Sequence, residues 1–329
     1  MFYALYKRIG IEALQFCTLP LFFVCKIVYN ILIGIRRQTA LNIQWYPGHM
    51  TKTRRMMEAH LKLVDVVAEV IDARIPISSC NPDIDDLVGD KPRVVVLNRA
   101  DQASREGNRL WAEYFRAQGI TVMECDAKSG SGVNQFTETV QLALKEKIAR
   151  WREKGLVGRP IRAMIVGVPN VGKSTFINKI AKRKSAKTSD RPGVTRGKQW
   201  VTVSQGLELL DTPGILWPKF EDERTGYHLA FTGAVRDAIM DTETLGFHLM
   251  EHLKLRNPQG LAERYKIEVT DDMTGWALLE TAGRKRGFLV SGGEIDIERM
   301  ANILLDEFRG GKLGRVTLEL PENIDREAE

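Results

Sequence analysis

The stretch that most constrains this chain is IRAMIVGVPNVGKST, from Ile161 to Thr175. It begins as an apolar run of strand type, breaks at Gly167, restarts as a helix after Gly172, and matches GxxxxGK[ST] in between. In that pattern, backbone N–H groups surround the phosphates of a nucleotide, and the helix presents the positive end of its dipole to them. The alternative is an ordinary glycine-rich turn, but the flanking strand and helix favour the phosphate loop. The chain is therefore predicted to bind a nucleoside triphosphate.

Side chains in this loop have separate predicted tasks. Lys173 is expected to reach the β- and γ-phosphates as a point charge, and Ser174 to give its hydroxyl to Mg²⁺. The predicted phosphate-binding residues are Gly167, Asn170, Val171, Gly172, Lys173, Ser174 and Thr175, together with Gly214 from a later segment.

That later segment is Asp211-Thr-Pro-Gly214, at the end of a predicted strand. In phosphate-loop enzymes an Asp in this place holds Mg²⁺ through water, and the Gly N–H bonds the γ-phosphate. Upstream, Pro192-Gly-Val-Thr195-Arg supplies Thr195 as the candidate that completes the Mg²⁺ shell and senses the γ-phosphate. An ordinary turn is the alternative for Asp211–Gly214, since such residues favour turns. The predicted Mg²⁺ ligands are Ser174, Thr195 and Asp211, and the predicted switch residues are Thr195, Asp211 and Ile215.

Asn98-Arg-Ala-Asp101 follows another predicted strand and is close to the NKxD motif of GTPases. A carboxylate at Asp101 can accept hydrogen bonds from both N1–H and the exocyclic amine of guanine, a pattern that adenine does not offer. A site of this kind rejects the wrong base because its acceptors would be left unpaired. Arg99 replaces the usual Lys, and its planar guanidinium can still lie over the base.

Cys125-Asp-Ala-Lys128 follows the next predicted strand and resembles the SAK motif, whose Ala N–H meets guanine O6. Asp126 stands where Ser is usual. Either motif alone could be a surface turn, but two at strand ends of one domain favour guanine. The predicted guanine-binding residues are Asn98, Arg99, Ala100, Asp101, Asp126, Ala127 and Lys128.

The order of these motifs indicates a circular permutation. In most GTPases the phosphate loop comes first, whereas here the base-reading residues 98–101 and 126–128 precede the phosphate loop 167–174, Thr195 and Asp211. Such a rearrangement is tolerated because domain termini often lie close together. It places the Asp211 segment directly before the C-terminal region, so contacts with the γ-phosphate are expected to move that region.

Strand and helix patterns alternate through the middle of the chain, which is typical of a doubly wound α/β domain with a mostly parallel sheet. Beyond it the signals are helical. We predict strands at 63–71, 93–97, 120–124, 199–204 and 207–210 besides the one before Gly167, and one long helix at 133–154. The later helices are expected at 226–240, 242–255, 274–285 and 296–309. The predicted organisation is an N-terminal extension 1–40, a circularly permuted P-loop GTPase domain 41–218, and a small all-helical C-terminal domain 219–329.

Taken together, these motifs resemble the ribosome biogenesis GTPase A family over about 41–321. The residues that carry the resemblance are Trp45–Met50 (WYPGHM), Asp72–Pro76 (DARIP), the NRAD, GVPNVGKST and PGVTR segments, and Asp211–Pro218 (DTPGILWP). The resemblance implies a cytoplasmic GTPase that binds the immature large (50S) ribosomal subunit late in its assembly and is stimulated by it. The helical domain would contact ribosomal RNA.

The resemblance also bears on hydrolysis. Ile215 stands where many GTPases place a water-orienting Gln, and an apolar side chain cannot orient water. The resemblance assigns that role to His49, whose imidazole can position or deprotonate water near neutral pH; packing or capping is the alternative. Asn170 resembles the phosphate-loop Asn of GTPases that use K⁺, so K⁺ is expected as an activating ion beside Mg²⁺.

The N-terminal segment admits more than one interpretation. Residues 14–35 are largely apolar but contain Pro20 and Lys26, which disfavours a membrane helix. Family members resemble this chain from just before WYPGHM, so residues 1–40 are expected to be an upstream mistranslation with Leu41 near the true start. A membrane-tethered GTPase that uses 14–35 is the alternative; no stable membrane association is expected.

The formal net charge of +6 and the pI near 9.1 are compatible with a nucleic-acid partner but do not require one. Four cysteines without metal-ligand spacing suggest reduced thiols. The candidate phosphate-contacting cations are Lys182, Arg183, Lys184, Lys187, Arg191, Arg196 and Lys198, and then Arg284, Lys285, Arg286, Lys312 and Arg315. Solvated faces are the alternative for both clusters. An RNA-binding module with incidental hydrolysis is the alternative function.

Overall fold

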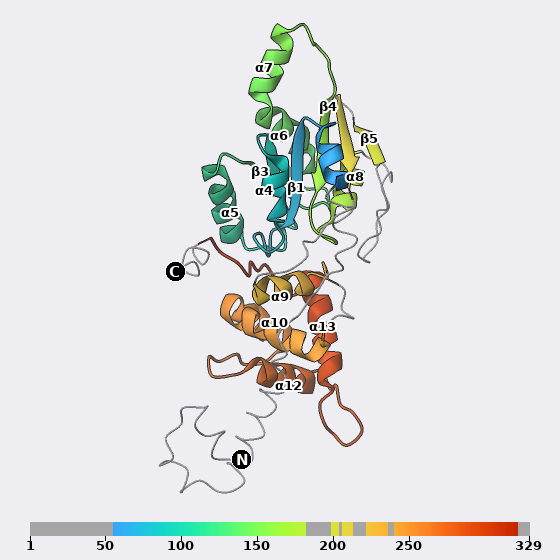
Figure 1. The fold of residues 1–329 in the computed structure, drawn as a ribbon. Coiled ribbons are helices and arrows are strands. Elements are labelled where there is room, and N and C mark those ends of the chain that lie inside the picture. The colour runs from blue at the N-terminus through green and yellow to red at the C-terminus, as the bar shows by residue number, and fades with distance from the viewer. Residues whose placement is uncertain (1–54, 182–198, 204–205, 213–221, 236–239, 322–329) are drawn as a thin grey trace, which may run out of the picture. The chain divides into compact units, whose positions relative to one another are not determined.

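The computed structural model describes residues 55–181, 199–203, 206–212, 222–235 and 240–321 (Figure 1). The chain divides into two compact units, Met1–Asn42 and Ile43–Glu329. Every described residue belongs to the second unit, so the predicted N-terminal extension lies outside the described residues.

A six-stranded sheet forms the centre of the predicted GTPase domain. Its strand order is β3-β2-β1-β4-β6-β5, and all neighbouring pairs are parallel except β5 with β6. This confirms the predicted doubly wound, mostly parallel fold. The strands are β1 (Val66–Asp72), β2 (Arg93–Asn98), β3 (Thr121–Cys125), β4 (Ile161–Val166), β5 (Gln199–Val203) and β6 (Leu207–Asp211).

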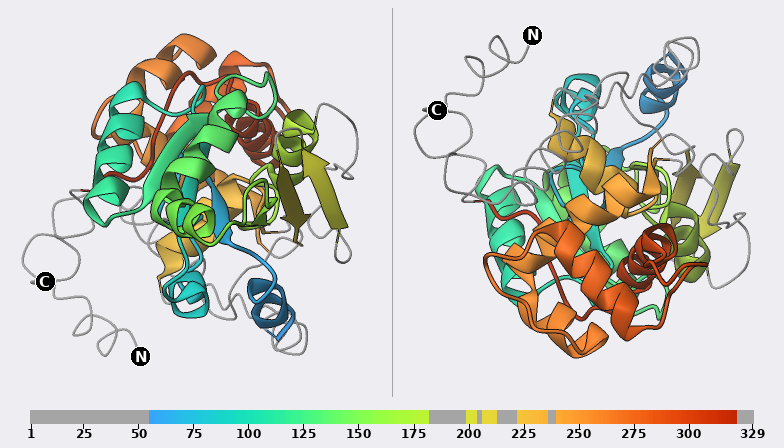
Figure 2. Two further views of the ribbon diagram at one scale, coloured as in Figure 1. Left: turned by 90° about the horizontal axis from the view of Figure 1, so that it is seen from above. Right: turned by 90° about the horizontal axis from the view of Figure 1, so that it is seen from below.

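Helices cover both faces of this sheet, as Figure 2 shows. On β1, Val66, Ala68 and Val70 point to the face that also packs on α6 and α8, while Val67 and Ile71 point to the other face. Burial on both sides explains why the strand reads as a continuous apolar run. The helices of this domain are α4 (Asp83–Val88), α5 (Arg105–Ala117), η1 (Val133–Gln135), α6 (Phe136–Ala143), α7 (Lys145–Glu153) and α8 (Lys173–Ile180).

The prediction of one helix at 133–154 is wrong in one respect: the chain forms two helices, α6 and α7, which are separated at Leu144. Leu144 has φ −101° and ψ 10° and its side chain is fully buried. α6 buries Phe136 and Val140, whereas α7 has no buried residue. Ile148 and Trp151 of α7 are partly buried against the same core, so both helices follow the predicted periodicity, but periodicity alone did not show the break between them.

The C-terminal region is helical, as predicted, with one helix missed and one shorter than expected. Pro258 does not end the helical structure; it occupies the first turn of α11, where its missing N–H costs nothing. α9 ends at Phe231, because Gly233 takes a left-handed conformation with φ 76°. The helices are α9 (Glu223–Phe231), α10 (Thr242–Arg256), α11 (Pro258–Tyr265), α12 (Gly275–Lys285) and α13 (Ile297–Arg309).

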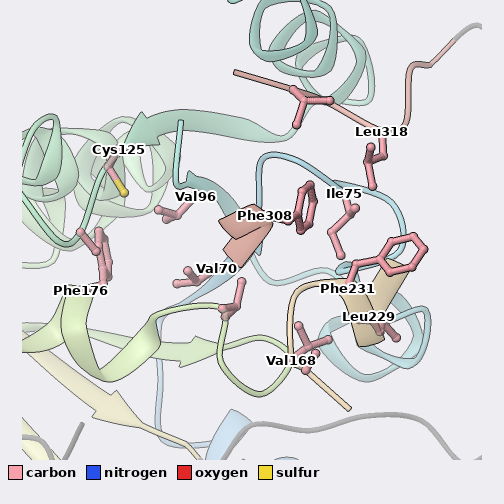
Figure 3. Packing of buried hydrophobic residues seen from close by; sticks show 14 of the residues in the cluster. Val70, Ile75, Val96, Cys125, Val168, Phe176, Leu229, Phe231, Phe308 and Leu318 are labelled. Carbon is pink, nitrogen blue, oxygen red and sulfur yellow. The ribbon is translucent and has the colours of Figure 1, made fainter. Parts of the chain in front are cut away.

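After α13 the chain returns to the GTPase domain. The Val316 N–H donates to the Gln102 carbonyl at 2.8 Å, and the Leu318 N–H donates to the Arg74 carbonyl at 2.8 Å. One hydrophobic cluster contains side chains of the sheet, of α9, of α13 and of this returning segment. Figure 3 shows Ile75, Phe231, Phe308 and Leu318 within it. The predicted helical domain is therefore packed directly onto the GTPase domain.

Within the described ranges, no helix is both long enough and apolar enough to cross a membrane. Residues 14–35 lie outside those ranges.

Candidate nucleotide site

The phosphate loop joins the end of β4 to the start of α8, as predicted. Gly167 has φ 143°, and a Cβ there would lie 2.2 Å from the Val70 carbonyl oxygen. Gly172 has φ 101°, and a Cβ there would lie 2.4 Å from Asn98 Nδ2. Both positions therefore require glycine, for the backbone angle and for the space.

Lys173 is the first residue of α8 and is only 6% exposed. Its Nζ donates to the carbonyls of Gly167 at 3.0 Å and Val168 at 2.8 Å, so the ammonium lies over the loop that is predicted to hold the phosphates. Burial lowers the pKa of Lys173 to about 8, although the charge of Asp211 opposes this. A buried cation beside backbone N–H groups is suited to receive phosphate oxygens. Val171 is buried below the loop, and Thr175 lies half-buried in the first turn of α8.

Two of the predicted Mg²⁺ ligands are brought together. Ser174 Oγ lies 3.5 Å from Asp211 Oδ2, at the ends of α8 and β6. Asp211 is fully buried, and its Oδ1 has no hydrogen-bond partner among the described residues. Burial raises the pKa of this carboxyl in spite of the nearby Lys173 charge. A buried carboxylate oxygen beside a hydroxyl suits Mg²⁺, because this ion prefers oxygen ligands and its positive charge would balance the buried negative charge.

Asn98 ties the phosphate loop to the base-reading loops. Its Nδ2 donates to the Val171 carbonyl at 2.7 Å, and its Oδ1 accepts from the Ala127 N–H at 3.0 Å. Asn98 is 3% exposed, so its buried side chain joins these loops from inside the protein. The Ala127 N–H, predicted for guanine O6, thus already has a partner in the protein, and its role toward the base stays a prediction.

The loop 125–128 is organised by Asp126, the residue that departs from the usual motif. Its carboxylate accepts from the Lys128 N–H at 2.8 Å and the Ser129 N–H at 3.0 Å. Burial would raise the pKa of Asp126, but the hydrogen bonds from Ser129 and Lys128 outweigh it and lower the pKa. The Asp126 side chain therefore forms an Asx turn, and these hydrogen bonds stabilise the loop where the usual motif has a Ser.

The remaining residues of the NRAD segment lie beside this loop. Ala100 donates its N–H to the Cys125 carbonyl at 3.1 Å, and its carbonyl accepts from Asn108 at 2.9 Å. Asp101 is exposed just beyond it. The predicted guanine carboxylate is thus held on a loop fixed from both sides, with its side chain accessible.

Arg99 and Asn170 both have positive φ, 59° and 57°. Arg99 donates to the Asn170 carbonyl at 3.3 Å, so the base-reading loop and the phosphate loop are joined a second time. Asn170 Nδ2 donates to the Gly233 carbonyl, just beyond α9, at 2.8 Å. The side chain predicted to bind K⁺ therefore also contacts the helical domain.

The described residues of the predicted site lie in the loop after β4, at the start of α8, at the end of β6 and in the loops after β2 and β3. Four predicted site residues lie outside the described ranges: His49, Thr195, Gly214 and Ile215. Sequence reasoning missed Arg74 and Arg309. Asp72 and Arg74 belong to the DARIP motif, but nothing local indicates that Arg74 donates to Phe308 at 2.7 Å.

Comparisons with known proteins point to one family of GTPases. A family model described as "50S ribosome-binding GTPase" matches residues 162–271. The Ribosome biogenesis GTPase A proteins of Bacillus cereus and Priestia megaterium are each 46% identical to this chain over 87% of its length, covering 97% and 99% of their own. A crystal structure of GNP-bound YlqF from Thermotoga maritima is 30% identical, covers 82% of this chain and 99% of its own, and has a TM-score of 0.59.

Along the chain, the base-reading loops after β2 and β3 come before the phosphate loop after β4, which is the permuted order of the motifs. The similarity to the relatives extends over nearly their whole length. GTPases generally use Mg²⁺ with GTP, and the Ser174–Asp211 pair fits that ion. The chain belongs to the ribosome biogenesis GTPase A family and is a GTP-hydrolysing enzyme.

Proposed function

We propose that this GTPase assists ribosome assembly by binding the immature large (50S) subunit late in its maturation, and that the subunit stimulates hydrolysis. The observation that carries the proposal is the 46% identity to proteins named Ribosome biogenesis GTPase A across almost their whole length. The family model described as "50S ribosome-binding GTPase" supports the choice of subunit.

The helical domain is the proposed contact with ribosomal RNA. Arg284 and Lys285 are exposed at the end of α12, and Lys312 and Arg315 are exposed after α13. Arg286 is partly engaged, because it forms an ion pair with Glu307 at 3.2 Å. Exposed cations of this kind contact phosphate backbones and give salt-sensitive affinity. The other basic cluster, at 182–198, lies outside the described residues.

Co-sedimentation with large-subunit precursors tests the proposal. The GTP-analogue form is expected to sediment with precursor particles, and the GDP form to be released. Lys173→Ala, which removes the phosphate-binding cation, serves as the control and is expected to bind without this dependence on nucleotide. If Lys173→Ala still supports subunit maturation in cells, the alternative of an RNA-binding module with incidental hydrolysis is favoured instead.

In the proposed mechanism, Ser174, Asp211 and Thr195 would hold Mg²⁺, which would supply positive charge beside the phosphate oxygens. Lys173 would contact the β- and γ-phosphates. Asp211 is pre-positioned for this task by its burial at the end of β6, and Lys173 by its contacts with the loop carbonyls. These two side chains then need little reorganisation when the nucleotide and Mg²⁺ bind.

His49 is proposed to orient the attacking water. Ile215 cannot do so, and an imidazole has a suitable proton affinity near neutral pH. His49→Ala is expected to keep GTP affinity and to lower subunit-stimulated turnover by about 10²–10⁴-fold. Stimulated turnover at the wild-type rate would rule out this role.

K⁺ is proposed as an activating ion beside Asn170. Only the side-chain oxygen of Asn170 can ligate a cation, and the amide nitrogen already donates to the Gly233 carbonyl, which fixes the orientation of the amide. GTP turnover is therefore expected to be faster in KCl than in NaCl at the same ionic strength. Equal rates in the two salts would remove the proposed role.

Nucleotide affinity is expected to fall as the pH rises above about 8. The pKa of Lys173 is about 8 in the free protein because the ammonium is buried, and bound phosphates would raise it. Below that pH the lysine is already protonated; above it, binding must take up a proton, so affinity falls by up to about tenfold per pH unit. Fluorescent GDP titrations between pH 7 and 9.5 measure this. A flat profile would contradict the assignment of Lys173 to the phosphates.

A further inference from the structure

The carboxyl end of α13 receives two arginines from the GTPase domain. Arg74 donates through NH1 to the Phe308 carbonyl at 2.7 Å, and Arg99 donates through NH1 to the Arg309 carbonyl at 3.0 Å. Asp72 orients both guanidinium groups, at 2.8 Å from Arg74 NH2 and 3.6 Å from Arg99 Nε. Cations at this position satisfy the last carbonyls of a helix and oppose its dipole.

Arg309 itself extends this chain of contacts to α9. Its Nε donates to the Phe231 carbonyl at 3.0 Å and its NH2 to the Ala230 carbonyl at 2.8 Å, so it caps the last turn of α9. Figure 3 shows Phe231 and Phe308, one from each helix, in the same apolar cluster. The ends of the two helices are therefore held together by apolar packing and by one guanidinium group.

Gly233, two residues beyond α9, connects this arrangement back to the phosphate loop. Its carbonyl accepts from Asn170 Nδ2 at 2.8 Å. A Cβ built at Gly233 would lie 3.5 Å from Arg309 Nε and 3.8 Å from Asn170 Nδ2, so both side chains border the same residue. These contacts form a circuit: Arg99 donates to Arg309, Arg309 donates to the last turn of α9, and Gly233 just beyond that helix accepts from Asn170. Arg99 closes the circuit by donating to the Asn170 carbonyl.

We propose that Arg309 is a positioning residue for the guanine nucleotide, and that the joined ends of α9 and α13 form the outer support of the nucleotide site. The side chain of Arg309 donates to main-chain carbonyls at the end of α9. It acts by fixing this helix end, because Gly233 just beyond it accepts from Asn170 of the phosphate loop, and the Arg309 carbonyl accepts from Arg99 of the base-reading loop. Nucleotide affinity then depends on the docking of the helical domain, and by linkage the nucleotide stabilises that docking. This proposal does not rest on ribosome binding.

The circuit also explains the arginine in the NRAD segment. One guanidinium reaches the Asn170 carbonyl, the Arg309 carbonyl and Asp72 together, because its donors are arranged in a planar fork. An ammonium on a flexible chain is less well suited to hold all three. Arg99→Lys is therefore expected to weaken the link to α13 while it keeps the charge of the loop.

The test measures fluorescent GDP affinity on the full chain. Arg309→Gln is expected to raise the dissociation constant about tenfold, within the usual range for couplings between sites. Arg309→Lys, which keeps the charge and one donor, is expected to recover part of that loss. Arg256→Gln is the matched control: it removes the same charge from an exposed position in the last turn of α10, and is expected to bind GDP as the wild type does.

A double-substitution cycle separates positioning from a general loss of structure. Asn170→Ala and Arg309→Gln act on one circuit, so the double variant is expected to bind GDP more tightly than the product of the two losses implies. Independent losses would overturn the proposal, as would GDP affinity within twofold of the wild type in Arg309→Gln. If Arg309→Gln does not melt cooperatively, Arg99→Lys replaces it in the same cycle, and the same two outcomes decide.

Discussion

Replacing Glu319 with alanine is expected to lower the free energy of unfolding by about 3–5 kcal/mol, because a buried charge network loses its central member. Glu319 is 3% exposed and lies where the returning C-terminal segment meets the GTPase domain and α9. It accepts from the Ile77 N–H at 2.8 Å, from the Ser78 N–H and hydroxyl, and from His228 Nδ1 at 2.7 Å. The substitution would leave these buried donors without their acceptor.

The same carboxylate makes stability depend on pH in a known direction. Burial would raise the pKa of Glu319, but the hydrogen bonds and charge of His228, together with Ser78, lower it overall. Because the folded pKa lies below the unfolded value of 4.5, the contribution is present above about pH 4.5 and is lost as the pH falls through the folded pKa. The wild type is therefore expected to lose its advantage over Glu319→Ala in acid.

Urea unfolding at pH 7, repeated at decreasing pH, measures both effects. Glu263→Ala is the matched control, since it makes the same substitution at an exposed position of α11 and is expected to change stability by less than about 0.5 kcal/mol. If Glu319→Ala unfolds at the same urea concentration as Glu263→Ala, the network contributes no net stability.

The sheet was predictable because its signals are local. Nearly continuous apolar runs such as the one in β1, interrupted by Glu69, identify buried parallel strands, and the glycines of the phosphate loop specify a backbone path that few sequences adopt. The break at Leu144 was not predictable, because both helices keep one apolar periodicity and pack on the same core. The buried face of α5 also depends on the core that it meets: Trp111 and Phe115 are buried, whereas Leu110 is only partly so.

The nucleotide site divides in the same way. Lys173, Ser174 and Asp101 could be proposed from short motifs, since their expected chemistry depends on neighbours a few positions away. Arg309, and Glu319 outside the site, could not, because their partners lie far along the chain: Arg99 and Arg309 are 210 positions apart, and Ser78 and Glu319 are 241 apart. A lone arginine at a helix end or a glutamate near a terminus gives no local signal of such contacts.

Replacing Asp101 with asparagine is expected to change the preferred base from guanine to xanthine. The predicted carboxylate accepts from guanine N1–H and from the exocyclic amine, whereas xanthine has a carbonyl in place of that amine. An asparagine amide can accept from N1–H and donate to the carbonyl, so the same two contacts form with xanthine. The loop should survive the change, because Asp101 is exposed and its neighbours are held by Asn108 and Cys125.

The size of the change follows from two hydrogen bonds to a charged group, each contributing about 1.5–3 kcal/mol. The ratio of GDP to XDP affinity is therefore expected to fall by roughly 10²–10⁴-fold, measured by displacement of a fluorescent nucleotide. Asp90→Asn makes the same substitution at an exposed residue after α4 and should leave the ratio unchanged. If Asp101→Asn keeps the guanine preference of Asp90→Asn, another residue reads the base, and the NRAD segment serves only to tie the loops through Asn98 and Arg99.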